Sequence, residues 1–279
     1  MALTHLDLFS GIGGFSLGLE KAGFRTIAFC EIEPFCQGIL RQHWPDVAIY
    51  EDVNKLCRRL YDCEPENEDG EVICPRCGID FGDCDCIGTD QFTDTHGHPT
   101  VITGGFPCQD ISVGHTWQKA KGIEGARSAL WWQFARIIGE LEPEWVVVEN
   151  VAALRNRGLD AVLQSLNALG YVGEWHVISA AALGAEHERE RVWIIAHHKG
   201  LGVEGLRPDW FQKSRSLVKP FLPLRDSHGE WQIEPDICRA NDGFPRKMDC
   251  ARLKAIGNAV VPAMPELIGY AIREAMNGN

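Results

Sequence analysis

One cysteine of this chain stands where a nucleophile could be reached. Cys108 follows a short apolar run and a pair of glycines, and it lies between Pro107 and Gln109. Cysteine is the common side chain that is strongly nucleophilic near neutral pH, because a usable fraction of it is thiolate. A buried, inert thiol is the ordinary alternative at a strand end. The flanking residues and the charged groups described next favour a nucleophile at Cys108.

Charged residues adjoin two other apolar runs. Glu149 comes at the end of the run 145–151, and a carboxylate at the end of a buried strand is costly unless it has a partner or a function. Arg189 and Arg191 lead into a further run, and alternate residues at a strand start point to one face. A solvated, ion-paired edge is the plainer interpretation of the two arginines.

A glycine-rich turn and two acids suggest a nucleoside site. Gly11 and Gly13 follow the first strand-like run, where glycine lets the backbone approach a ligand beside a helix N-terminus. Glu31 ends the second run and is suited to ribose hydroxyls, and Asp52 ends the third and is suited to the amino group of adenine. The alternative is that both acids are helix N-caps or solvated ends.

Strand and helix patterns alternate along the first half of the chain. Apolar positions at steps of three and four predict a helix over 130–141. Short runs that are apolar on both faces predict a doubly wound α/β fold with a parallel sheet. The predicted strands are 4–9, 26–32, 47–53, 100–106 and 145–151, and the runs 174–180 and 191–197 extend the sheet.

Length and composition are those of a globular protein. The chain has 279 residues, 45% of them hydrophobic and 24% charged, so it can hold one large domain and a small one. No apolar run approaches the roughly 20 residues that span a bilayer, and the N-terminus lacks the pattern of a signal peptide. We therefore expect a cytoplasmic, monomeric protein without a membrane, whose 11 cysteines are thiols or metal ligands.

Acidity is concentrated in one insert. Residues 61–98 hold 11 acidic residues and one basic residue, Arg76, so they carry −10 of the total charge of −12. The remaining residues are nearly neutral and are free to present a basic groove, since local potential decides whether a surface attracts nucleic acid.

The same insert holds a possible metal site. A Cys-x-x-Cys-Gly turn followed by Cys-x-Cys predicts a structural zinc bound by Cys74, Cys77, Cys84 and Cys86. The second pair is tighter than usual, so one ligand could instead be Cys57, Cys63, His96 or His98. Free thiols are one alternative, and a catalytic zinc deaminase site is the other.

The domain plan follows from these patterns. We expect a catalytic domain of residues 1–198 and 251–279 that carries the insert 61–98. Prolines and few periodic stretches mark 199–250 as a small loop-rich domain.

Seven motifs in order resemble the DNA (cytosine-5) methyltransferase family of bacteria and bacteriophages. They are the Phe-x-Gly-x-Gly turn (Phe9, Gly11, Gly13), Glu31, Asp52, Pro107-Cys108-Gln109, Glu149-Asn150-Val151, the pair Arg189 and Arg191, and Gly257-Asn258-Ala259-Val260-Val261-Pro262. The likeness runs from residue 7 to about 265. Where the family has glutamine before the arginine pair, this chain has His187, which can still form a hydrogen bond.

The resemblance implies a reaction and a role for each motif. It implies a Rossmann-like sheet that binds S-adenosylmethionine, a small target-recognition domain over 199–250, and transfer of a methyl group to C5 of cytosine in duplex DNA. Cys108 would add to C6 of the ring, Glu149 would act at N3, and Arg191, supported by Arg189, would hold the charge near O2. The target base would be flipped out of the duplex.

The resemblance also implies the residues that hold the cofactor and the DNA. For S-adenosylmethionine they are Phe9, Gly11, Ile12, Gly13, Glu31, Ile32, Asp52, Val53, Pro107, Asn258, Ala259 and Val260. For DNA they are Gln109, Ser112, Lys119 and Lys121 in the loop after the cysteine, and Arg239 and Arg246 in the recognition domain. The alternatives are a transfer-RNA cytosine-5 methyltransferase, a small-molecule methyltransferase and a zinc-bearing binding protein without enzymatic activity.

Overall fold

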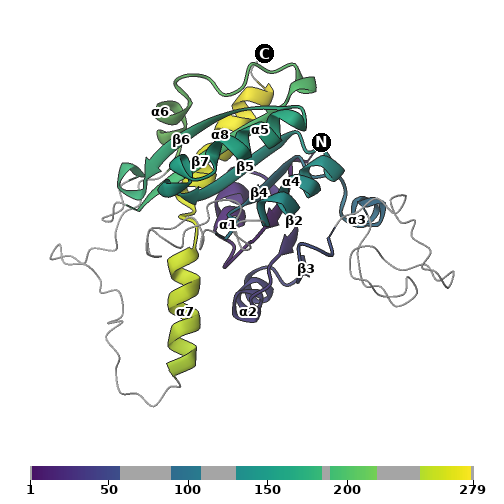
Figure 1. Ribbon diagram of the computed structural model, residues 1–279, viewed down its shortest axis with the longest axis vertical. Helices are drawn as coiled ribbons and strands as arrows, with labels where there is room; N and C mark the ends of the chain where they lie inside the picture. Colours follow the sequence, from purple (N-terminus) through teal and green to yellow (C-terminus); the bar gives the residue numbers. More distant parts are fainter. Residues whose placement is uncertain (1, 57–88, 108–129, 184–188, 219–245, 278–279) are drawn as a thin grey trace.

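A single sheet organises the part of the chain that the structure describes. The computed structural model describes residues 2–56, 89–107, 130–183, 189–218 and 246–277, and within them the strand order is β3-β2-β1-β4-β5-β7-β6. Helices cover both faces of this sheet (Figure 1). The strands are β1 (Thr4–Leu8), β2 (Arg25–Cys30), β3 (Ala48–Tyr50), β4 (Val101–Gly104), β5 (Trp145–Val151), β6 (Tyr171–Ser179) and β7 (Glu190–His198).

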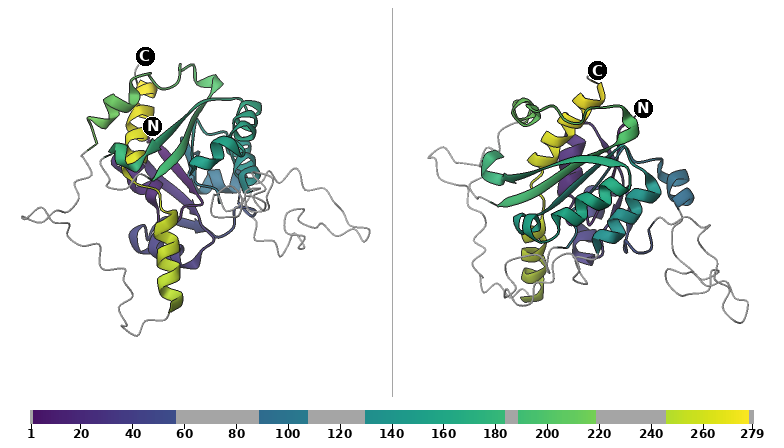
Figure 2. Two further views of the ribbon diagram at one scale, coloured as in Figure 1. Left: turned by 60° about the vertical axis from the view of Figure 1, so that its left-hand side comes forward. Right: turned by 45° about the horizontal axis from the view of Figure 1, so that its top comes forward.

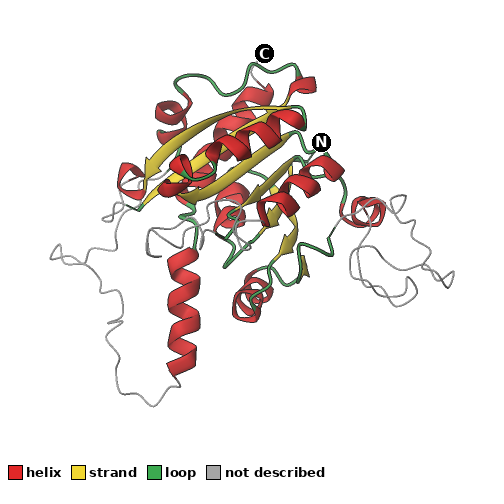
Figure 3. Cartoon of the chain, in the orientation of Figure 1, coloured by secondary structure: helices red, strands yellow, loops and turns green. Residues whose placement is uncertain are grey.

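The helices follow the apolar spacing of the sequence. In α4, Trp131, Phe134 and Ile138 are fully buried on one face, which confirms the helix predicted over 130–141. Short 3-10 helices, η3 (Ala152–Asn156), η4 (Ala180–Leu183) and η5 (Lys199–Leu201), lie in the connections (Figure 3). The α-helices are α1 (Gly14–Lys21), α2 (Pro34–His43), α3 (Thr89–His96), α4 (Leu130–Leu141), α5 (Leu159–Ala168), α6 (Trp210–Arg215), α7 (Arg246–Asn258) and α8 (Ala263–Asn277).

The sheet is mixed, so the prediction of a parallel sheet is right in one part and wrong in the other. Strands β1 to β5 are parallel to one another, as predicted. Strand β7 is antiparallel to both β5 and β6. The ten residues between β6 and β7 are fewer than the dozen or so that a parallel crossover needs.

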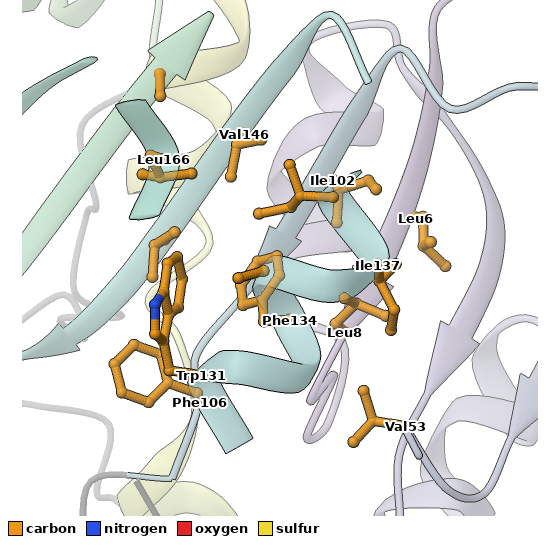
Figure 4. Packing of buried hydrophobic residues seen from close by; sticks show 14 of the residues in the cluster. Leu6, Leu8, Val53, Ile102, Phe106, Trp131, Phe134, Ile137, Val146 and Leu166 are labelled. Carbon is orange, nitrogen blue, oxygen red and sulfur yellow. The ribbon is translucent and has the colours of Figure 1, made fainter. Parts of the chain in front are cut away.

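Two hydrophobic layers enclose the sheet. Along β5, Val146 and Val148 pack against α4 and α5, whereas Trp145 and Val147 face the layer of α1 and α8. Figure 4 shows the first layer, where Trp131 and Phe134 of α4 meet apolar side chains of the strands. Burial on both faces explains why the strands are continuously apolar in sequence.

Parts of the insert and of the predicted recognition region pack on this core. Helix α3 belongs to the insert 61–98, and its Phe92 is fully buried beside the ring of Tyr50. Helix α6 belongs to the segment 199–250, and its Trp210 is buried in the layer that includes α8. The domain boundaries drawn from the sequence remain predictions.

The C-terminal helices have different environments. Helix α8 buries Met264, Leu267 and Ile268 against α1, while α7 projects away from the sheet in all three views (Figures 1 and 2). By length and composition, Lys254–Asn277 is apolar enough to cross a membrane, but half of its apolar window is buried inside the protein. A core helix passes the same test, so the expectation that no segment spans a membrane stays a prediction.

Candidate active site

The glycine-rich turn lies where β1 leads into α1. Its backbone is left-handed at Phe9 (φ 53°), Gly11 (φ 56°) and Gly13 (φ 84°). Gly13 is the N-cap of α1 and has no side chain to cap the helix. The turn is therefore a backbone cradle at a helix N-terminus, as its glycines predict.

Glu31 joins this cradle to the second strand. The Gly11 backbone N–H donates to Glu31 Oε2 at 2.7 Å, and the Glu33 N–H donates to Oε1 at 2.7 Å. The side chain is buried, and burial raises the pKa of the carboxyl. Glu31 is thus neither a helix N-cap nor a solvated end, because Glu33 caps α2. Each carboxylate oxygen keeps a lone pair that a hydroxyl group can use.

An open cleft of about 940 Å³ lies next to Glu31. Ile32, Ile49 and Tyr50 line it on the apolar side, and Ile32 is 70% exposed. Asp52 is also in its wall, where its carboxylate accepts the backbone N–H of Asn54 at 2.9 Å.

Val53 stays a predicted cofactor residue, although two of its groups have other partners. Its side chain is buried in the core, and its carbonyl accepts a hydrogen bond from Arg136 Nη2 at 2.9 Å. The Val53 side chain therefore points into the core and away from the cleft.

The C-terminal segment returns to the glycine turn, as predicted. A Cβ atom added to Gly14 would overlap the carbonyl oxygen of Val260, and one added to Gly18 would overlap that of Pro262. Lys254 in α7 forms an ion pair with Glu33. Asn258, Ala259 and Val260 are exposed or half-buried beside this contact, so their positions suit the predicted cofactor site.

Glu149 and Arg191 form a close pair at the end of β5. Arg191 Nε lies 2.8 Å from Glu149 Oε1, and the two residues belong to the antiparallel strands β5 and β7. Burial raises the pKa of Glu149, and the charges of Arg191 and Arg189 act in the opposite direction. Both partners line a small pocket of about 20 Å³, together with Trp193, Val261 and others.

The strand that leads to Cys108 is tied to this pair. A Cβ atom added to Gly105 would lie 3.1 Å from Glu149 Oε2, so the backbone after β4 passes close to the carboxylate. The buried Asn150 side chain donates from Nδ2 to the Phe106 carbonyl at 3.1 Å. The described chain reaches Pro107 at this point, and Cys108 lies outside the described residues.

Arg189 lies near the pair but has other partners. Its Nη2 donates to the carbonyls of Gly257 at 2.8 Å and Ala259 at 2.7 Å, so it holds the segment between α7 and α8. Arg191 is the arginine that contacts the carboxylate of Glu149. The two arginines thus have separate tasks within one pocket.

Several predicted residues lie outside the described part of the chain. Arg246 begins α7, although its side chain is not described. The described residues contain no group of three or more His, Cys, Asp or Glu that could hold a metal. His96 Nε2 is hydrogen-bonded to the Tyr50 hydroxyl at 2.7 Å, so a metal would have to bind its other ring nitrogen, Nδ1. Outside the described residues lie Gln109, Ser112, Lys119, Lys121, His187, Arg239 and the four cysteines Cys74, Cys77, Cys84 and Cys86.

One polar cluster was not predicted from the sequence. Asp7 of β1 is fully buried and is hydrogen-bonded to Ser16 of α1 and to Thr103 of β4, while His5 contacts the same two hydroxyls. The available signal was a histidine and an aspartate in an otherwise apolar strand before the glycine turn.

Comparisons with known proteins agree with this geometry. The Type II methyltransferase M.Sau3AI of Staphylococcus aureus is 30% identical over 203 residues, which cover 70% of this chain and 43% of that protein. M.Eco47II of Escherichia coli is 30% identical over 252 residues, 88% of this chain and 50% of that protein. The structure of the Entamoeba histolytica methyltransferase EhMeth has a TM-score of 0.59 and 13% identity, covering 98% of this chain and 99% of its own.

These likenesses differ in what they establish. The likeness to EhMeth shows a shared fold. The chain spans about half the length of the two curated relatives, so their activities do not transfer directly. The model of the C-5 cytosine-specific DNA methylase family matches residues 3–227, which is more than half of the chain. The chain therefore belongs to the C-5 cytosine-specific DNA methylase family.

Proposed function

We propose that the protein is a DNA (cytosine-5-)-methyltransferase that transfers a methyl group from S-adenosylmethionine to C5 of a flipped-out cytosine in duplex DNA. The observation that carries the proposal is the ion pair of the buried Glu149 with the half-buried Arg191, 2.8 Å apart, beside the backbone that leads to Cys108. A nucleophile, an acid and a fixed cation are what addition to a cytosine ring requires.

The chemistry follows from these three groups. The Cys108 thiolate would form a bond to C6, and the electron pair of the ring would move toward C5 and N3. Glu149 would share a proton with N3, and burial helps the carboxyl to take up that proton because it raises the pKa. Arg191 would hold the charge near O2. C5 would then take the methyl group, while the electron pair of the broken methyl–sulfur bond would stay on the sulfur of the donor. Removal of the C5 proton by water would re-form the ring double bond, expel the Cys108 thiolate from C6 and return the N3 proton to Glu149.

The residues around the glycine turn fit S-adenosylmethionine, which supplies the methyl group. The left-handed turn at Phe9, Gly11 and Gly13 lets the backbone approach, and Ile12 lies within it. Glu31 offers lone pairs to the ribose hydroxyls. The exposed Ile32 provides an apolar face for the adenine, with Asp52 at its edge. Asn258, Ala259, Val260 and Pro107 would complete the pocket.

We infer that duplex DNA is bound by loops around this site. Gln109, Ser112, Lys119 and Lys121 would lie near the flipped base, while Arg239 and Arg246 in the segment 199–250 would contact the target sequence. A monomeric, cytoplasmic enzyme is the form that we propose.

We also propose a structural zinc in the insert. Cys74, Cys77, Cys84 and Cys86 supply four thiolates, which satisfy a closed tetrahedral site. Metal analysis of the purified protein is expected to give about one zinc per chain. The absence of near-stoichiometric metal, with all four thiols titratable in the native protein, would end this idea.

Transfer of labelled methyl groups tests the main proposal. Duplex DNA, transfer RNA and free nucleosides are offered in parallel, and incorporation is expected in duplex DNA at cytosine. Cys108→Ala should abolish it, whereas Cys36→Ala should not, since Cys36 is buried in the fold and its pKa is raised to about 11.

A second measurement isolates the covalent step. A duplex oligonucleotide containing 5-fluorocytosine should form a stable adduct at Cys108. Undiminished methylation by Cys108→Ala, or methylation of transfer RNA in place of duplex DNA, would contradict the proposal.

A further inference from the structure

A closed ring of four side chains lies directly beneath the glycine turn. Ser16 Oγ is 2.8 Å from Asp7 Oδ2, and Thr103 Oγ1 is 3.4 Å from Asp7 Oδ1. His5 Nε2 is 2.7 Å from Thr103 Oγ1, and its Nδ1 is 3.5 Å from Ser16 Oγ. All four residues are fully buried, so solvent does not complete their hydrogen bonds.

The ring connects the three elements that position the turn. Asp7 ends the sheet side of the turn in β1, and Ser16 lies in the first turn of α1, on its helix side. Thr103 belongs to β4, which pairs with β1 at Asp7 and then leads toward Cys108. Gly13, at the N-cap of α1, has no side chain that could accept a hydrogen bond from the first turn of the helix. The Asp7 carboxyl group accepts one from the Ser16 backbone N–H instead.

Counting protons identifies the state of the ring. Each hydroxyl has one proton to donate. If Asp7 is a carboxylate and His5 is neutral, the two hydroxyls and one ring N–H supply three protons for four contacts, so one contact has no proton, whichever nitrogen of His5 carries the ring proton. A proton on Asp7 Oδ2 supplies the fourth proton, and each contact then has one donor. Asp7 donates to Ser16 Oγ, and Ser16 donates to His5 Nδ1. His5 Nε2–H donates to Thr103 Oγ1, and Thr103 donates to Asp7 Oδ1.

The same number of protons could be arranged as a carboxylate and an imidazolium. That arrangement would bury two charges, which is costly away from water. Burial raises the pKa of Asp7 to about 8 and lowers that of His5 to about 3, so the neutral arrangement is favoured. Glu31 is the other charged group acting on Asp7, and its negative charge works in the same direction.

We propose that Asp7 is a positioning residue for the cofactor turn, held in its protonated form within a neutral ring of His5, Ser16 and Thr103. The ring fixes the distance between the end of β1 and the start of α1, and hence the shape of the cradle between them. The identity of the cofactor rests on the proposed function, whereas the protonation of the ring does not.

The first experiment measures the pH dependence of stability without any ligand. An acid whose pKa is raised on folding keeps a proton that the unfolded chain has lost, so it makes stability fall as pH rises from about 4 to about 8. Asp7→Asn keeps the shape and cannot ionise. The melting temperature of wild type should therefore fall relative to that of Asp7→Asn between pH 5 and 8, and the difference should become constant above that range.

The second experiment measures affinity for S-adenosylhomocysteine by calorimetry at pH 7. Thr103→Val removes the hydroxyl that closes the ring and should weaken binding about fivefold, on the scale of one lost hydrogen bond. Thr26→Val is the matched control, because the buried Thr26 hydroxyl in β2 has no hydrogen-bond partner among the described residues. Its affinity should stay at the wild-type value.

Each result bears on a separate part of the reasoning. An Asp7→Asn variant with the same pH dependence as wild type would overturn the protonated ring. Equal affinities of Thr103→Val and Thr26→Val would overturn its positioning role. Failure of the wild-type protein to bind S-adenosylhomocysteine would instead overturn the cofactor assignment of the proposed function, and with it the role of the turn in binding.

Discussion

Gly18 marks the closest approach between the two ends of the chain. It lies in α1, buried against the start of α8. A Cβ atom added there would overlap the Pro262 carbonyl oxygen and would lie 2.8 Å from the Glu266 backbone N and 2.9 Å from Pro265 Cβ. Because these neighbours are backbone atoms and a proline ring, they cannot rotate away. Gly18→Ala must therefore push α1 and α8 apart.

The size of the effect follows from two opposing contributions. Overpacking of this kind costs about 1–3 kcal/mol. Alanine in place of glycine inside a helix contributes up to about 1 kcal/mol in the favourable direction. We expect a net loss of about 1 kcal/mol, which lowers the melting temperature by about 2–4 °C for a domain of this size. Affinity for S-adenosylhomocysteine should fall as well, since Pro262 lies two residues after Val260, the last residue of the segment that we propose for the cofactor site.

The matched control is Gly38→Ala in α2. An added Cβ at Gly38 has no heavy atom within 4 Å, so only the helix preference changes, and this variant should be stabilised by up to about 1 kcal/mol. Thermal unfolding of both variants and of wild type, each with and without ligand, gives the comparison. If Gly18→Ala is as stable as Gly38→Ala, α1 does not pack as closely on α8 as the structure shows.

Three further substitutions probe the site. Glu149→Gln removes the acid that faces Arg191. Wild-type turnover should decline as pH rises through the raised pKa of Glu149, and the residual activity of the variant should not show this decline. If both proteins show it, the pH dependence belongs to another group. Asn150→Ala leaves the buried Phe106 carbonyl without its donor, at a cost of about 1–3 kcal/mol. It should slow adduct formation more than it weakens cofactor binding. The exposed Asn167→Ala, whose side chain contacts Lys199 at the surface, should do neither, and equal behaviour of the two variants would refute the tie to Cys108. Ile32→Ala should weaken S-adenosylhomocysteine binding several-fold with no change in melting temperature, because the side chain is 70% exposed until a ligand covers it. Leu217→Ala, also exposed, is its control, and an unchanged affinity of Ile32→Ala would remove the residue from the site.

The alternation of strands and helices could be predicted from the sequence, because buried positions carry apolar residues at the spacing of each element. Strands β1 to β5 are apolar on both faces, and α4 repeats its apolar residues at helical spacing. Polar residues that interrupt these runs, such as Glu31 and Glu149, fall at the edge where a ligand site forms. Strand direction left no such record, so the antiparallel pairing of β7 was missed.

The partners of each site residue required the three-dimensional arrangement. Arg189 and Arg191 look equivalent in sequence, two positions apart, yet one holds the carbonyls of Gly257 and Ala259 and the other contacts Glu149. The left-handed backbone of Arg189 (φ 25°) adjoins an extended strand, so simple alternation does not describe how the two side chains are directed.

What can be read from the chain is therefore local: the order of strands and helices, the glycine turn, and the kinds of residue at each strand end. Hydrogen-bond partners are not local, because they join residues nearly a hundred positions apart, as with Asp7 and Thr103. Folding places His5, Asp7, Ser16 and Thr103 in one fully buried cluster, and burial raises the pKa of Asp7 and lowers that of His5. Residue types are inherited from the sequence, whereas charge states and pairings arise from burial.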